Sequence, residues 1–215
     1  MAINNLYLLF SLLAFLIFSL VSWMVWTNYR PWIRLEARIN AFLYAVFGQP
    51  EMTYGDGFGN ALLTFLVTYG SATFLSAITV LIALCFFLKG DFLLGLWFMG
   101  VMSTGGIFGL VLKNIFRRKR PHNHLSVESG YSFPSGHAIA STLFFLSLVF
   151  VFLPKIEIVL FRLPLIMMAL SAWLAILFSR LYFHAHHLGD LIVGASYGIF
   201  WVMNALMIYQ WLLNF

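Results

Sequence analysis

Histidines, one carboxylate and clustered cations gather in one part of this chain, and together they could bind and cleave a phosphate. The basic run 113–120 carries five of the twelve lysines and arginines. Two well-separated histidines, His137 and His186, follow it, and Asp190 comes last. Cations offset the charge of a phosphate, and histidine serves as nucleophile, acid or base. The rest of the chain is apolar enough to be the scaffold.

The basic run predicts a set of converging cations. Lys113, Arg117 and Arg120 are spaced i, i+4 and i+7, so they would share one face of a helix that continues past the membrane. Pro121 disfavours helical geometry at Arg120, and we expect the helix to end there. For residues 117–119 we favour the alternative interpretation, a basic cluster that binds anionic lipid or sets the orientation in the membrane.

A Pro134-Ser135-Gly136-His137 run stands directly before the apolar stretch 138–153. Ser135 can cap a helix, Gly136 lets the backbone approach a ligand closely, and free N–H groups at a helix start bind anions. His137 could donate to an oxygen of the bound group. Taken alone, the run is better explained as a capping serine beside a surface histidine.

Asp190 lies four residues after His186, so the two can face each other within one helical turn. A carboxylate at one ring nitrogen fixes the tautomer and leaves the other nitrogen as nucleophile or base. Arg180, before the same loop, adds a cation. His184 and His187 raise the alternative of a metal site, which is disfavoured because no cysteine and only one carboxylate lie nearby in the sequence. We therefore predict neither a metal nor another cofactor.

The composition is that of an integral membrane protein. Of 215 residues, 62% are hydrophobic and 9% charged, with a mean hydropathy of +0.94. The net charge of +5 is too clustered for a nucleic-acid surface, so we expect an anionic substrate or lipid headgroups as partners. The lone Cys85 excludes an internal disulfide.

Hydropathy predicts an all-α fold, a single domain over 1–215 with six membrane-spanning helices. The expected spans are 5–26, 61–88, 92–112, 138–153, 164–179 and 191–213. The first is favoured as an uncleaved anchor over a signal peptide, because it lacks a basic leader and a cleavage pattern.

Residues 31–47 carry an apolar stripe, with Arg34 and Arg38 away from it, which predicts a helix at the membrane interface. A strand would also fit the alternation of charge there, but it would leave backbone groups unpaired beside lipid. We expect 48–60 to be a loop.

Six spans would place both termini on one side and loops 27–60, 113–137 and 180–190 on the other, so all the chemistry gathers there. Two Gly-x-x-x-Gly pairs, 105/109 and 194/198, would allow close helix packing. The alternative is that glycine is common in membrane helices, and the sequence leaves both open.

Three motifs together resemble the signature of the type 2 phosphatidic acid phosphatase superfamily. They are Lys113-x6-Arg120-Pro121, Pro134-Ser135-Gly136-His137 and Ser179-Arg180-x5-His186-x3-Asp190. The family includes membrane lipid phosphatases and vanadium haloperoxidases, and its six-span layout fits the hydropathy of nearly the whole chain. The haloperoxidases are soluble, so the resemblance implies a membrane phosphatase.

The resemblance implies a metal-independent reaction through a phosphohistidine. His186 would attack phosphorus with Asp190 orienting it, and His137 would protonate the leaving oxygen and then activate water. The phosphoryl oxygens would be held by Lys113, Arg120, Ser135, Gly136 and Arg180. His184 and His187 depart from the bacterial pattern around the nucleophile, and could alter its proton affinity or the shape of the substrate mouth.

The expected substrate is a lipid whose phosphate sits at headgroup level. Undecaprenyl pyrophosphate is our first choice, followed by phosphatidylglycerol phosphate and phosphatidate. A non-catalytic lipid-binding or scaffolding member is the alternative, and the oligomeric state stays open.

The resemblance implies a bacterial inner-membrane protein with its site facing outward. The positive-inside rule predicts the opposite, because nine of the twelve lysines and arginines fall on the catalytic side. We follow the resemblance.

Overall fold

The computed structural model describes residues 2–121 and 130–213, and every regular element within these ranges is helical. The all-α prediction is therefore confirmed. The elements are α1 (Ala2–Trp26), α2 (Arg30–Phe47), α3 (Gly57–Tyr69), α4 (Ala72–Leu88), α5 (Phe92–Phe116), α6 (Gly136–Ser147), a π-helical turn η1 (Leu148–Phe152), a 3-10 turn η2 (Leu153–Lys155), α7 (Val159–Tyr182) and α8 (Leu188–Leu213).

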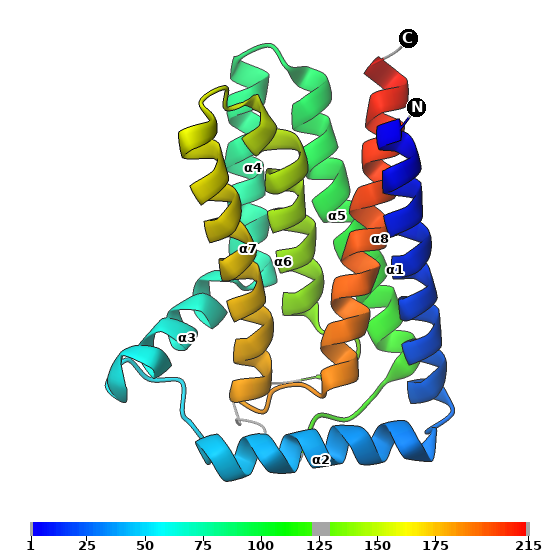
Figure 1. The fold of residues 1–215 in the computed structure, drawn as a ribbon, viewed down its shortest axis with the longest axis vertical. Coiled ribbons are helices and arrows are strands. Elements are labelled where there is room, and N and C mark those ends of the chain that lie inside the picture. Colours follow the sequence, from blue (N-terminus) through cyan, green and yellow to red (C-terminus); the bar gives the residue numbers. More distant parts are fainter. Residues whose placement is uncertain (1, 122–129, 214–215) are drawn as a thin grey trace.

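The long helices stand side by side, and α2 lies across one end of the bundle (Figure 1). Both termini lie at the opposite end, as the six-span layout requires. We call the end that carries α2 and residues 117–121 and 183–187 the loop end. Helix α1 packs along α8, and α6 packs between α5, α7 and α8.

Five of the described helices are long and apolar enough to cross a membrane, and the bent pair α3–α4 can supply a sixth span. Continuous helical runs satisfy all backbone hydrogen bonds internally, which the bilayer interior requires. The chain is thus a multi-pass membrane protein.

The predicted continuous span 61–88 is wrong, because the helix breaks at Gly70 and bends by 61°. Ser71 accepts from the backbone N–H of Phe74 and starts a new helix. A Cβ at Gly70 would lie 2.6 Å from Ile176 Cδ1 of α7, so this glycine also permits close packing. Helix α3 begins at Gly57, so the predicted loop 48–60 is shorter than expected.

The predicted helix up to Arg120 is also wrong. Helix α5 ends at Phe116, and Arg117 takes a left-handed conformation with φ of 48° that closes the helix through its N–H to the Lys113 carbonyl. Lys113, Arg117 and Arg120 therefore do not share a helical face. The chain after Arg117 turns inward instead of continuing into solvent.

Helix α2 confirms the helical prediction for 31–47. Its protein-facing side carries buried Glu36 and Leu43, with Asn40 partly buried between them. Leu35 and Phe42 of the predicted apolar stripe are exposed, which suits contact with lipid.

Both Gly-x-x-x-Gly pairs permit close packing against α6. A Cβ at Gly194 would lie 2.7 Å from Ala138 Cβ, and one at Gly198 would lie 2.7 Å from Thr142 Cβ. A Cβ at Gly109 would meet Ile139 at 2.7 Å. The close-packing interpretation of these glycines is therefore confirmed.

Helix α7 begins at Val159, earlier than the predicted start at Pro164, and carries this proline inside the helix. The missing N–H of Pro164 removes only one intrahelical bond, and the apolar residues before it extend the span.

Candidate active site

The loop between α7 and α8 places His186 in a buried position at the loop end. The backbone carbonyl of Arg180 accepts from the N–H groups of Ala185 (3.0 Å) and His186 (3.3 Å), which folds the loop back over the end of α7. Only 2% of the His186 side chain is exposed. The imidazole is thereby held in a fixed environment.

Asp190 and Arg120 face opposite nitrogens of the His186 ring. His186 Nδ1 lies 3.4 Å from Asp190 Oδ2, and Nε2 lies 3.4 Å from Arg120 Nη1. A guanidinium N–H can only donate, so Nε2 accepts and the ring proton sits on Nδ1, toward the carboxylate. This tautomer leaves a lone pair on Nε2.

The His186 imidazole is neutral at physiological pH. Burial lowers its pKa from 6.5 to about 4; Asp190 opposes this shift, and the charges of Arg180 and Arg120 add to it. Arg180 is itself fully buried. A neutral ring is the form that can act as a nucleophile.

Arg120 is anchored by the backbone on both sides. Its Nη1 donates to the Ala185 carbonyl at 2.8 Å, and its Nε donates to the Gly130 carbonyl at 3.2 Å. The guanidinium is therefore held beside the Nε2 nitrogen of His186.

Asp190 is fully buried and each of its oxygens is bound. Oδ1 accepts from Arg118 Nη1 at 2.7 Å, and Oδ2 accepts from the His187 backbone N–H at 3.0 Å. The Asp190 carbonyl also accepts from the Ser135 N–H at 3.1 Å, which joins the starts of α6 and α8.

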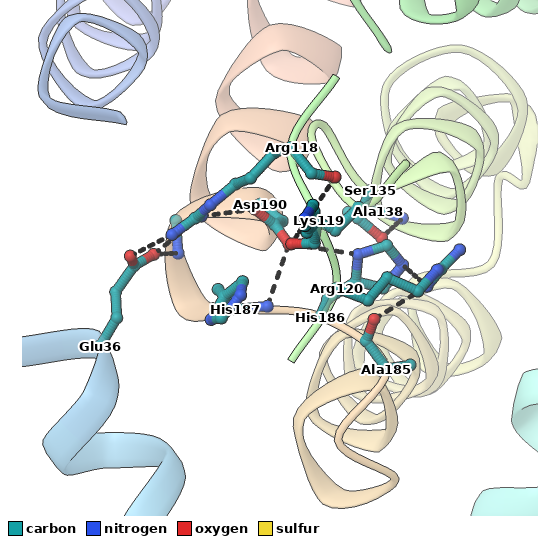
Figure 2. Close-up of polar contacts among 12 residues, drawn as sticks. Glu36, Arg118, Lys119, Arg120, Ser135, Ala138, Ala185, His186, His187 and Asp190 are labelled. Carbon is teal, nitrogen blue, oxygen red and sulfur yellow. Dashed lines mark hydrogen bonds and ion pairs between the residues drawn. The ribbon is translucent and has the colours of Figure 1, made fainter. Parts of the chain in front are cut away.

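Arg118 corrects our expectation of a lipid-binding cluster at residues 117–119. Its guanidinium lies between Asp190 and Glu36 of α2 (Figure 2). Nη1 donates to Glu36 Oε1 at 3.1 Å, and Nη2 is paired with Glu36 Oε2. Burial works to lower the pKa of Arg118, but hydrogen bonds and charge from the two carboxylates outweigh it and raise the pKa. Arg117 and Lys119, on either side, are exposed.

Glu36 and Arg118 were not predicted as site residues, because the residues that they contact are distant in the sequence. Glu36 had one available signal: it is the sole carboxylate in the first 50 residues of the chain. A lone acidic residue in a basic, apolar helix needs a partner when buried. Nothing local separates Arg118 from its basic neighbours.

Ser132 fixes the segment that carries Arg118. Its N–H donates to the Arg118 carbonyl at 2.8 Å, and its hydroxyl donates to the Lys119 carbonyl at 3.0 Å. Ser132 is fully buried, so this short pairing is shielded from water.

The structure places Ser135 and Gly136 at the start of α6 as predicted. Ser135 is the N-cap, and its hydroxyl accepts from the Ala138 N–H at 3.4 Å. His137 Nε2 lies 3.3 Å from the Val67 carbonyl of α3, so this nitrogen carries a proton. Of these residues, Ser135 contacts the start of α8 directly, through its N–H to the Asp190 carbonyl.

Lys113 lines a cavity of about 310 Å³ between α4, α5 and α6. Lys113, Pro134 and Gly136 line its loop end, and the rest of the lining is mostly apolar, including Ile107, Leu110, Ile139 and Leu143. An apolar groove thus leads to the predicted phosphate-binding residues.

His184 and His187 hold the loop between α7 and α8 to α2. His184 Nε2 donates to the Gly48 carbonyl at 2.9 Å, and Asn40 Nδ2 donates to His187 Nδ1 at 3.1 Å. Burial, with the nearby charge of Arg118, lowers the pKa of His187. Within residues 2–121 and 130–213, no group of three or more His, Cys, Asp or Glu side chains could hold a metal ion.

Comparison with protein families identifies a match to the PAP2 superfamily over residues 94–214. The chain belongs to the PAP2 superfamily. Among solved structures, this PAP2 chain is similar to a transmembrane PAP2-type phosphatidylglycerolphosphate phosphatase from Bacillus subtilis. The TM-score is 0.75 and the sequence identity is 22%, and the match covers 93% of this chain and 96% of that one. Comparison with curated protein sequences gives no significant match.

The membership and the shared fold support a membrane-bound lipid phosphatase, a hydrolase. The expected resemblance to the phosphatidic acid phosphatase superfamily is confirmed.

Proposed function

We propose that this PAP2 protein hydrolyses a lipid phosphate or pyrophosphate through a phosphohistidine on His186, without a metal ion. The observation that carries the proposal is the His186 ring, held by Asp190 at Nδ1 with Nε2 turned toward Arg120. This geometry supports the proposal, because Nε2 would be the attacking nitrogen and Arg120 would offset the charge that gathers on the transferred group.

In the first step the lone pair of His186 Nε2 attacks phosphorus, and the bond to the leaving oxygen breaks. The imidazolium form of His137 donates its Nε2 proton to that oxygen and becomes neutral, and the oxygen takes the place of the Val67 carbonyl as acceptor. In the second step His137 accepts a proton from water, whose oxygen displaces His186 and releases phosphate. Asp190 keeps the Nδ1 proton in place throughout.

Lys113, Arg120 and Arg180 would supply the positive charge around the phosphoryl oxygens. Ser135 and the backbone of Gly136 would add neutral donors at the start of α6, where free N–H groups favour anions. Arg180 is fully buried, and its charge also acts on His186.

The groove between α4, α5 and α6 favours a lipid substrate. Its apolar lining would hold a chain of the lipid, while Lys113 and Gly136 meet the phosphate at the loop end. Undecaprenyl pyrophosphate is the first substrate to test. Phosphatidylglycerol phosphate is the second substrate to test, because the similar solved structure is named for activity on it. Phosphatidate is the third. We place the protein in a bacterial inner membrane with the loop end outward.

The test is phosphate release from these three lipids by purified protein in excess chelator, with His186→Ala as control. Chelator-resistant release that His186→Ala abolishes supports the proposal. A labelled headgroup should also leave an acid-labile, base-stable phosphoprotein that accumulates in His137→Ala. Release that requires metal, or that survives in His186→Ala, would overturn the mechanism, and lipid binding without release would favour a non-catalytic role.

A further inference from the structure

Glu36 of the interfacial helix is joined to the His186–Asp190 pair through a single side chain, Arg118 (Figure 2). We propose that Arg118 and Glu36 are positioning residues for the reaction: Arg118 fixes the orientation of Asp190, and Glu36 fixes Arg118 and the start of α8. This inference rests on the proposed function, since it assigns roles around the same histidine.

The burial of these charges favours a specific role over a surface ion pair. The exposed fractions are 14% for the Arg118 side chain, 2% for Glu36 and 0% for Asp190. Buried charges are costly to desolvate, and such groups can specify a geometry that apolar residues would not. Here one guanidinium satisfies oxygens on two carboxylates from different helices, so it defines the distance between α2 and α8.

Arg118 binds one carboxylate oxygen of Asp190, so the other oxygen is the one that faces His186. Arg118 binds Oδ1, while Oδ2 faces His186 Nδ1 and the His187 N–H. Without the guanidinium, the carboxylate could rotate about its last bond and lose its alignment with His186 Nδ1 while staying near the ring. Because Arg118 would no longer neutralise the carboxylate, its negative charge would act more strongly on the imidazole.

Glu36 reaches α8 directly as well. Its Oε1 accepts from the Gly189 N–H at 2.9 Å, at the first turn of the helix that carries Asp190. A Cβ at Gly189 would lie 2.7 Å from this same oxygen, so the glycine permits the contact. A carboxylate at a helix N-terminus is favoured by the helix dipole.

Two more contacts attach α2 to the same loop. Asn40 lies one turn after Glu36 and binds His187, and the Gly48 carbonyl at the end of α2 binds His184. Residues on both sides of His186 are therefore held by a helix that lies across the end of the bundle (Figure 1). Docking of α2 at the membrane surface would thus steady the catalytic loop.

The experiment compares Arg118→Gln, Arg118→Lys, Glu36→Gln and the double Arg118→Gln/Glu36→Gln with wild type. Arg117→Gln and Arg34→Gln are matched controls, because each replaces an exposed arginine close in sequence to a tested residue. For each protein, kcat, KM and the pH dependence of kcat/KM are measured on a lipid phosphate and on a soluble aryl phosphate. Thermal unfolding in detergent monitors folding.

We expect Arg118→Gln to lower kcat about 100-fold on both substrates, the loss that misplacement of a reacting group produces, with little change in KM. Arg118→Lys should recover part of the loss. The double variant should resemble Arg118→Gln, because residues in one network are not additive. The controls should match wild type.

The acid limb of the pH profile should move to higher pH in Arg118→Gln. The charged groups that face His186 are Asp190 from α8, Arg180 from α7 and Arg120 after α5. Arg118 and His187 act on Asp190, and Glu36 is paired with Arg118. Loss of Arg118 leaves Asp190 less neutralised, which stabilises the protonated imidazole.

Variants that only unfold at lower temperature, with kcat and pH profile unchanged, would overturn the positioning role. Additive losses in the double variant would also overturn it. Retained activity in His186→Ala, measured in parallel, would instead overturn the proposed function on which this role rests.

Discussion

His186 Nδ1 lies 3.4 Å from Asp190 Oδ2, across one turn at the start of α8. The contact fixes the ring while the opposite nitrogen stays turned toward Arg120. Asp190 is bound in turn by Arg118 and by the start of α6, so the position of the His186 ring also depends on these two segments.

The activity should persist at acidic pH. Burial lowers the pKa of His186 to about 4, so the nucleophilic neutral form is fully populated near pH 6, where an ordinary histidine with a pKa of 6.5 is mostly protonated. Activity is lost only as the pH falls through that lowered pKa. After correction for the titration of the substrate, the acid limb of kcat/KM should have its midpoint closer to 4 than to 6.5. A midpoint at 6.5 or above would contradict a buried, neutral His186.

Arg120→Lys should lower kcat/KM by about 100-fold, comparable to the loss of one preorganised charge-stabilising donor. Lysine keeps the charge, but it cannot bind the Ala185 and Gly130 carbonyls while facing His186 Nε2. Steady-state kinetics measure the effect. Lys119→Gln, at the exposed neighbouring position, is the control and should keep wild-type values; equal losses in both would point to a general charge effect.

Filling the groove should affect lipids selectively. Gly106 lines the cavity, and a Cβ there meets no other atom within 4 Å, so Gly106→Leu can fold while occupying the space proposed for a lipid chain. We expect KM for a long-chain lipid phosphate to rise about tenfold, which corresponds to about 1.4 kcal/mol of binding, and KM for a soluble aryl phosphate to stay constant. Gly100→Leu, outside this cavity, is the control. Equal effects on both substrates would place the lipid chain elsewhere.

Gly194→Val should separate α8 from α6 and lower both thermal stability and activity. A Cβ there would lie 2.7 Å from Ala138 Cβ and 3.0 Å from the Ser135 carbonyl, beside the contact that joins Ser135 to Asp190. Overpacking of a fitted contact costs about 1–3 kcal/mol. Thermal unfolding in detergent measures the loss, and Gly100→Ala should unfold at the wild-type temperature. Wild-type stability and activity in Gly194→Val would show that neither depends on the close contact between α6 and α8.

The loop end should face outward in cells. With Cys85 replaced by serine, Glu51→Cys at the loop end should react with a membrane-impermeant maleimide in intact cells, because this position is exposed. Glu157→Cys, before α7, should react only after lysis. The reverse pattern would favour the orientation that the positive-inside rule predicts.

Much of the fold followed from local sequence. Uncharged apolar runs predicted the helices because a bilayer leaves few other ways to satisfy the backbone. Ser135 was recognisable as a cap because capping depends on neighbours three residues away. The break at Gly70 was not predicted, because the apolar run continues through it, although Ser71 caps the new helix in the same local way.

The sequence by itself determined which residues could carry the chemistry, since His186 and Asp190 are four residues apart and the flanking motifs have fixed spacing. The tertiary structure decided how they are supported. The left-handed turn at Arg117 directs Arg118 inward, where it meets Glu36, 82 residues away in the chain. The position of the carboxylates in space decides which arginine of a basic run is buried, because a buried charge needs a partner to offset the cost of its desolvation.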